Sequence, residues 1–164
     1  MAASRLPATP APQWRVSQWF NTDRPLGLGD FRGRVIALHA FQMLCPGCAQ
    51  AGLPQAQRIA RIFDPASVAV IGLHTVFEHH DAMTPAALAA FIHEYRLTFP
   101  IGIDHPGEPG PLPQTMQAYA MRGTPSLILI DSQGMVRKHS FGVDDDMQVG
   151  ADIALLLAEQ GVPE

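Results

Sequence analysis

The two cysteines of this chain lie close together, at Cys45 and Cys48, with only a proline and a glycine between them. No other cysteine occurs among the 164 residues. A pair with this spacing suits three kinds of site: a dithiol that cycles with its disulfide, half of a metal site, or two inert buried side chains. The secondary structure predicted around the two cysteines helps to choose among these three kinds of site.

The position of the pair favours redox chemistry. Residues 35–41 form an apolar run that predicts a buried strand, and helical spacing follows from Cys45 onwards to residue 63. At the N-terminus of a helix, unpaired amides and the positive end of the helix dipole favour a thiolate. Pro46 takes an early helical position where its missing N–H is harmless. We therefore expect Cys45 to attack a disulfide and Cys48, about one turn further on, to resolve the mixed disulfide.

Zinc binding is the second functional interpretation. A tetrahedral site needs four ligands, usually supplied by two paired motifs. The nearest other cluster, residues 78–81 (EHHD), lacks that spacing and predicts a solvated turn. We expect no metal and no other cofactor. The third interpretation, an inert buried pair, stays open on spacing alone.

The rest of the chain alternates strands and helices before a final hairpin and helix. The predicted elements are a strand at 67–74, a helix at 86–95 begun by Thr84 and Pro85, a strand at 99–104, a short helix at 114–121, an antiparallel hairpin of 125–131 and 135–141, and a helix at 146–160. This order implies an α/β domain with three layers, α/β/α, around a mixed sheet.

Composition narrows the class of protein. Apolar residues make up 47%, charged residues 16%, and the formal net charge is -4, which is typical of a globular domain and offers no basic stripe for nucleic acid. Residues 1–13 predict a loosely held tail and 14–164 a single domain. The tail lacks the apolar segment of a secretory signal, and no run of about 18 apolar residues could span a bilayer. We therefore expect a cytoplasmic protein without membrane contacts, either a monomer or a weak dimer.

Three segments besides the cysteines carry a family resemblance. Residues 26–35 are a leucine-containing lead-in to an Asp-aromatic-Arg-Gly turn, Pro54 follows Cys48 by six residues, and residues 121–131 read MRGTPSLILID. Together with the cysteines they resemble the thioredoxin-fold superfamily, and within it the TlpA-like thiol-disulfide oxidoreductases of the redoxin family. The resemblance covers residues 19–157. It implies a thioredoxin-like fold, a kink at Pro54 and disulfide exchange.

The resemblance also implies further site residues. Pro125 matches the cis-proline of the family and would flank the cysteines, while Thr124 would offer its backbone to an extended substrate segment, as in strand addition. Without the resemblance, the Thr-Pro pair predicts a turn that begins a strand. His39 takes the place of a buried Asp that moves the resolving thiol's proton in thioredoxins, and His74 the place of a functional Glu in some TlpA-like relatives. Each histidine is a candidate proton relay, and each also fits a core imidazole bonded to a backbone carbonyl.

Two positions depart from the family pattern. Relatives usually carry a Trp immediately before the first cysteine, where this chain has Leu44. The dipeptide between the cysteines is Pro-Gly, whereas thioredoxins commonly have Gly-Pro. In the family, the identity of this dipeptide strongly influences the redox potential. Substrate contacts near the thiol and the potential itself are therefore left open.

Three functions compete. The first is a thiol-disulfide oxidoreductase that reduces protein or small-molecule disulfides and is recycled by an unidentified electron donor. The second is a peroxiredoxin-like peroxide reductase. Such enzymes have a proline and a hydroxyl residue in the peroxide-binding loop, and this chain has Leu38 and Gln42 at those positions, so the peroxide pocket is expected to be absent. The third is a metal-binding module using Cys45, Cys48 and a histidine, although copper-handling relatives have a wider cysteine spacing. Residues 76–83 and 105–113 are candidate surface segments for selecting the partner.

Overall fold

A single mixed sheet organises the molecule. The structure is a computed structural model that describes residues 8–161. In this part of the chain, seven strands lie in the order β1-β7-β6-β3-β4-β5-β2. They are β1 (Thr9–Pro10), β2 (Val16–Phe20), β3 (Val35–Phe41), β4 (Val68–His74), β5 (Ile101–Asp104), β6 (Ser126–Ile130) and β7 (Met135–Phe141). The β3–β4 and β4–β5 pairs are parallel and the other pairs are antiparallel, which confirms the predicted mixed sheet.

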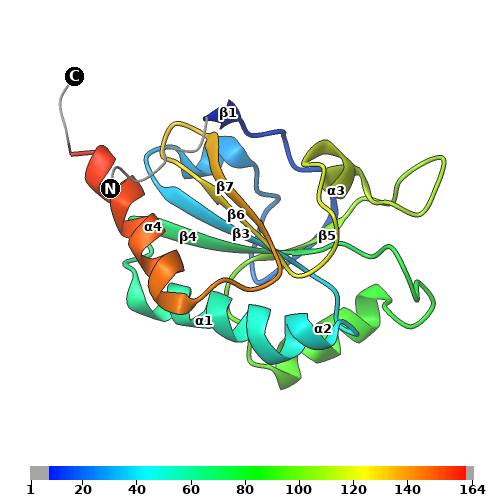
Figure 1. Ribbon diagram of the computed structural model, residues 1–164. Helices are drawn as coiled ribbons and strands as arrows, with labels where there is room; N and C mark the ends of the chain where they lie inside the picture. The colour runs from blue at the N-terminus through cyan, green and yellow to red at the C-terminus, as the bar shows by residue number, and fades with distance from the viewer. Residues whose placement is uncertain (1–7, 162–164) are drawn as a thin grey trace.

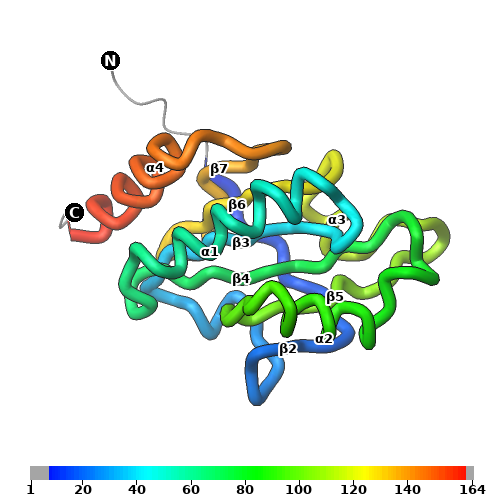
Figure 2. Tube along the Cα trace, turned by 90° about the horizontal axis from the view of Figure 1, so that it is seen from below, coloured from blue at the N-terminus to red at the C-terminus, as the bar shows by residue number. Residues whose placement is uncertain are grey.

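The apolar runs that predicted the two central strands are buried along their whole length, because helices cover both faces of the sheet. Alternate β3 side chains point to opposite faces. Val35, Ala37 and Phe41 join one core cluster, and Ile36, Leu38 and Ala40 join the other. Figure 1 shows the resulting three layers, which confirm the predicted α/β/α arrangement, and Figure 2 shows α1 and α2 lying across one face of the sheet. The first cluster lies under α1 (Leu53–Ile62), α2 (Pro85–Glu94) and α4 (Asp146–Glu159), and the second under α3 (Gln114–Ala118) and the 3-10 turn η1 (Leu28–Phe31).

The helix that follows the cysteines begins with a wide turn. Residues Cys48–Gly52 (η2) are π-helical, and the Leu53 N–H donates to the Cys48 carbonyl five residues back. Pro54 lies directly after this turn, at the start of α1. A proline has no N–H for an α-helical hydrogen bond, so the irregularity predicted there takes the form of a π turn.

The remaining helix starts and the hairpin follow the sequence closely. The Thr84 side chain accepts a hydrogen bond from the Ala87 N–H at 3.2 Å and caps α2, whose first residue is Pro85. β6 and β7 form the predicted hairpin, and α4 closes the chain from Asp146. Both the terminal hairpin and the C-terminal helix are confirmed.

The N-terminal segment is more ordered than predicted. Thr9 and Pro10, placed in the loosely held tail of residues 1–13, pair antiparallel with β7. The Ala11 N–H extends this pairing by donating to the Gly134 carbonyl at 2.9 Å. Residues 1–7 of the predicted tail lie outside the described residues. Local sequence does not reveal a two-residue strand containing proline, because its pairing depends on a hairpin far along the chain.

One edge of the sheet gathers the segments that carry candidate site residues. β3, β4 and β5 run parallel, so their carboxyl ends meet at the same edge. β6 is antiparallel to β3, with Ala40 opposite Ser126, so it begins at that edge. The segment after β3 and the segment before β6 therefore meet at the right-hand end of the sheet in Figure 1, which brings Cys45 and Thr124 together.

Candidate active site

The two cysteines are joined by a disulfide, with a Cα–Cα distance of 5.2 Å. This separation lies within the ordinary range for a disulfide. Cys45 is partly exposed, whereas Cys48 has an exposed fraction of 0%. An incoming reagent can therefore reach the Cys45 sulfur and not the Cys48 sulfur.

Cys45 is the N-cap residue of the helical segment. Its carbonyl accepts the first helical hydrogen bond, from the Ala49 N–H at 3.1 Å. Its Sγ accepts a second bond, from the Cys48 N–H at 3.2 Å. A sulfur in this position, at the positive end of the helix dipole, is stabilised as a thiolate when the disulfide is reduced. The predicted placement of Cys45 at a helix N-terminus is confirmed.

The structure brings the Thr-Pro pair against the cysteines. The Thr124–Pro125 peptide bond is cis. The Thr124 carbonyl lies 3.6 Å from Cys45 Sγ, and the Pro125 ring lies against Gly47, where a Cβ would be 3.5 Å from Pro125 Cδ. Thr124 is partly exposed and Pro125 is buried. A polar backbone segment thus lies beside the accessible sulfur.

Gly52 allows these elements to approach each other, and the sequence analysis missed it. A Cβ at this position would lie 2.7 Å from His39 Cε1 and 3.1 Å from Pro125 Cβ. Any other residue would have to displace the imidazole or the proline. The available signal was a glycine inside a predicted helix, which often marks a close approach.

His39 is a buried histidine with an unused nitrogen. It lies on β3, is 3% exposed, and its Nε2 has no hydrogen-bond partner among the described residues. Burial lowers the pKa of His39 to about 4, because the charged form would lose its hydration. The imidazole is therefore neutral near pH 7. Its ring faces the helical segment that begins at Cys48, since it lies against Gly52.

His74 has a different environment. It ends β4, is 1% exposed, and its Nε2 accepts a hydrogen bond from the Met43 N–H at 3.2 Å. Burial lowers its pKa to about 4 as well. A neutral His74 therefore holds the turn between β3 and Cys45 in place.

Gln42 also lies at the site, and the sequence analysis used it only as the residue that replaces a peroxidase hydroxyl. Its side chain is 1% exposed and bonds to both Thr124 and Phe77. A polar residue that directly follows a buried strand was the available signal.

Comparison with known proteins places the chain in a family. The model of the AhpC/TSA family matches residues 7–139, most of the sequence. The chain belongs to the AhpC/TSA family. It is accordingly a redoxin with a thioredoxin-like fold, an oxidoreductase whose two cysteines lie close together.

Solved structures agree with the family assignment. A thioredoxin-like superfamily protein, SPOA0173, is 55% identical with a TM-score of 0.90, over 94% of this chain and 97% of that one. A thiol-disulfide isomerase from Corynebacterium glutamicum is 47% identical with a TM-score of 0.86, over 90% of this chain and 97% of that one. A search of curated proteins gave no match.

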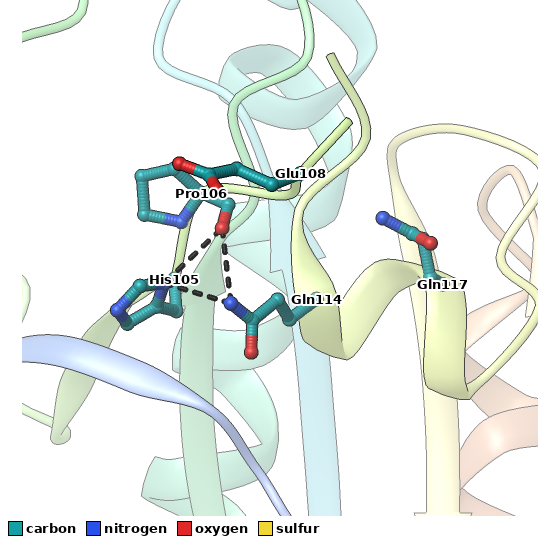
Figure 3. A pocket seen from close by; sticks show the side chains of 5 residues that line it. All are labelled: His105, Pro106, Glu108, Gln114 and Gln117. Atoms are coloured by element: carbon teal, nitrogen blue, oxygen red, sulfur yellow. Dashed lines mark hydrogen bonds between the residues drawn. The ribbon is translucent and has the colours of Figure 1, made fainter. Parts of the chain in front are cut away.

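This AhpC/TSA protein has a surface pocket at the carboxyl end of β5, the same edge that holds the cysteines. Its volume is about 520 Å³. The Gln114 amide donates to the Pro106 carbonyl at 3.1 Å and lies 3.0 Å from His105 Nδ1, as Figure 3 shows. β5 is two strands from β3, so the pocket is displaced by roughly 10 Å along the edge. Neither cysteine lines it.

Residues 8–161 of this redoxin offer neither a metal cluster nor a membrane-spanning helix. No group of three or more His, Cys, Asp or Glu side chains is placed to hold a metal ion there. None of the helices in that range is long and apolar enough to cross a membrane.

Proposed function

We propose that this protein is a thiol-disulfide oxidoreductase that cycles between dithiol and disulfide at Cys45 and Cys48. The asymmetry of the pair carries the proposal. The Cys45 sulfur is accessible and accepts an amide hydrogen bond at a helix N-terminus, whereas the Cys48 sulfur is buried behind it. The C. glutamicum structure, 47% identical and described as a thiol-disulfide isomerase, supports this class of reaction.

The proposed cycle begins with the reduced protein. The Cys45 thiolate attacks one sulfur of a substrate disulfide, that S–S bond breaks, and one substrate thiolate leaves. Cys48 then loses its proton and attacks the Cys45 sulfur, which releases the second substrate thiolate. The substrate gains two electrons and the protein becomes the disulfide seen in the structure. An external thiol or dithiol donor must restore the reduced form.

Thr124 and Pro125 are proposed to bind the substrate. An extended segment beside Cys45 would pair with the Thr124 backbone, in the manner of an added strand. The 3.6 Å separation of the Thr124 carbonyl from Cys45 Sγ supports this arrangement. This part of the proposal also retains the TlpA-like character and the role of the cis-proline suggested by the sequence.

His39 is proposed to accept the Cys48 proton. Its Nε2 is buried and unbonded, and the ring lies against the helical turn that begins at Cys48, so a lone pair faces that turn. Because burial lowers the pKa of this imidazole, it is a weak base, and we propose that it takes the proton only as the Cys48 sulfur attacks Cys45. His74 is proposed to act differently, since its Nε2 already accepts the Met43 N–H. We assign His74 to holding the turn before Cys45.

Replacement of His39 by leucine is expected to slow the resolving step by roughly tenfold, less than the hundredfold or more that a base with a pKa near the working pH supplies, because burial makes this imidazole a weak base. The measurement is the lifetime of the mixed disulfide after rapid mixing with a peptide disulfide. Iodoacetamide labelling of Cys45 serves as the control and should keep its rate. An unchanged adduct lifetime would rule out His39 as the base.

The direction of the reaction is proposed to be reduction, as expected for a protein working in the cytoplasm. The substrate is a protein or small-molecule disulfide, and the donor is a thiol system of the same compartment. We propose a monomer or a weak dimer as the working form.

Peroxide reduction is disfavoured by the geometry. The position of a peroxidase hydroxyl is occupied by Gln42, whose side chain is buried and bonded to Thr124 and Phe77. Metal binding through the cysteines would require further ligands, and the described residues offer no cluster of that kind.

One assay separates the three functions. The reduced protein is mixed in parallel with insulin and a thiol donor, with hydrogen peroxide, and with zinc or copper. We expect catalytic turnover with insulin only. Faster turnover with peroxide, or retention of one metal ion per chain without turnover, would overturn the proposal.

A further inference from the structure

Gln42 lies directly after β3 and three residues before Cys45. Its Oε1 accepts the Phe77 N–H at 3.2 Å, and its Nε2 donates to Thr124 Oγ1 at 3.4 Å. Its backbone carbonyl accepts the Cys45 N–H at 3.2 Å. With 1% exposure, the amide has no access to water and depends on these partners.

Gln42 therefore connects three segments that are far apart in the sequence. They are the loop that carries Cys45, the segment after β4 that contains Phe77, and the segment before β6 that contains Thr124. β3 lies between β4 and β6 in the sheet, so a side chain at its end can reach both neighbours. No other residue of the site bonds to all three segments among the hydrogen bonds of the described chain.

The hydrogen bond from Gln42 to Thr124 affects the reaction because it sets the position of Thr124 relative to Cys45. Thr124 presents its carbonyl 3.6 Å from Cys45 Sγ and is partly exposed, and its hydroxyl accepts the Gln42 amide at 3.4 Å. Disulfide exchange requires the incoming S–S bond to be aligned with the attacking sulfur. A displacement of about 1 Å in such an arrangement costs up to roughly a hundredfold in rate.

We propose that Gln42 is a positioning residue for peptide disulfides: it fixes Thr124 relative to Cys45, so that a segment bound along Thr124 presents its disulfide to the thiolate. The inference rests on the proposed function and deepens it, because it assigns the site to substrates with a peptide backbone. A small disulfide that makes no contact with Thr124 gains nothing from this bond.

The test compares two substrates in wild-type protein and three variants. Gln42→Met keeps the side-chain length and removes the amide, Thr124→Val removes the same bond from its other end, and the third variant combines both. The substrates are a peptide with an internal disulfide and bis(2-hydroxyethyl) disulfide, which has no peptide backbone. Gln18→Met, at an exposed glutamine on the edge strand β2, is the matched control.

We expect each single variant to lose about tenfold in kcat/KM for the peptide, mainly through KM, and to lose several-fold less with the small disulfide, whereas Gln18→Met should keep both rates. The double variant should lose no more than either single variant, because both remove one shared interaction. If Gln42→Met does not fold, Thr124→Val alone still gives the comparison between substrates.

Three results would overturn the inference: unchanged peptide kinetics, equal losses with both substrates, or additive losses in the double variant. Equal losses would mean that Gln42 positions the Cys45 thiol rather than the segment that binds the substrate. A wild-type protein that reduces neither substrate would instead overturn the proposed function. The two failures are therefore distinguishable in one experiment.

Discussion

Cys45→Ser is expected to lower disulfide reduction by roughly three orders of magnitude or more, since a serine hydroxyl is not ionised near pH 7 and cannot attack a disulfide. The buried Cys48 cannot replace it, because its sulfur has an exposed fraction of 0%. The measurement is turnover of insulin or of a peptide disulfide with a thiol donor in excess.

Cys48→Ser is the matched control for this prediction. It should also lose turnover, but it should accumulate a stable mixed disulfide through Cys45, because the attacking thiol remains and the resolving thiol is gone. Mass spectrometry of the non-reduced protein identifies the adduct. Adduct formation by Cys45→Ser and not by Cys48→Ser would reverse the two roles.

Acidification is expected to destabilise the fold strongly between about pH 6.5 and pH 4. Burial lowers the pKa of both His39 and His74 from 6.5 to about 4. The unfolded chain therefore takes up these two protons at a higher pH than the folded chain does, and stability falls as the pH falls through this window. The loss is on the order of 3 kcal/mol for each histidine. Above about pH 7 both histidines are neutral in the folded and in the unfolded chain, so the full stability is present there.

Urea unfolding at pH 7 and at pH 4.5 measures this effect. Asp104 acts in the opposite direction, because burial raises the pKa of its carboxyl group. His139 adds to the effect of the two core histidines, because burial lowers its pKa as well. His39→Leu provides the internal control and should make the pH dependence clearly smaller without abolishing it, because His74 and His139 remain. An unfolding free energy that stays constant over the window would contradict the description of two buried neutral imidazoles.

Most of the fold could be predicted from local patterns. The run at residues 35–41 predicted β3 because a central strand is buried on both faces and reads as continuously apolar. Thr84 and Pro85 predicted the start of α2 because capping is a local interaction. β1 was missed because its pairing with β7 depends on a contact that no local pattern records. The π turn before Pro54 was not predicted either, because it depends on the detailed backbone geometry.

The site residues show the same difference between local patterns and long-range contacts. The spacing of Cys45 and Cys48 and their position between a predicted strand and helix pointed to redox chemistry. Thr124 and Pro125 were found through the family resemblance, and the sheet topology brings them beside Cys45. Gln42 and Gly52 were missed as site residues, because their contacts are made across β3, the helix and the segment before β6. A sequence shows which residues can do chemistry more readily than which residues hold them in position.

The most direct test of the account is the pH dependence of alkylation in the reduced protein, with the modified cysteine identified by mass spectrometry. We predict that iodoacetamide modifies Cys45 alone, with an apparent pKa below the value of about 8.5 for a free thiol. Modification of Cys48 first, or titration of Cys45 at or above about 8.5, would contradict the claim that the helix N-terminus maintains an accessible thiolate.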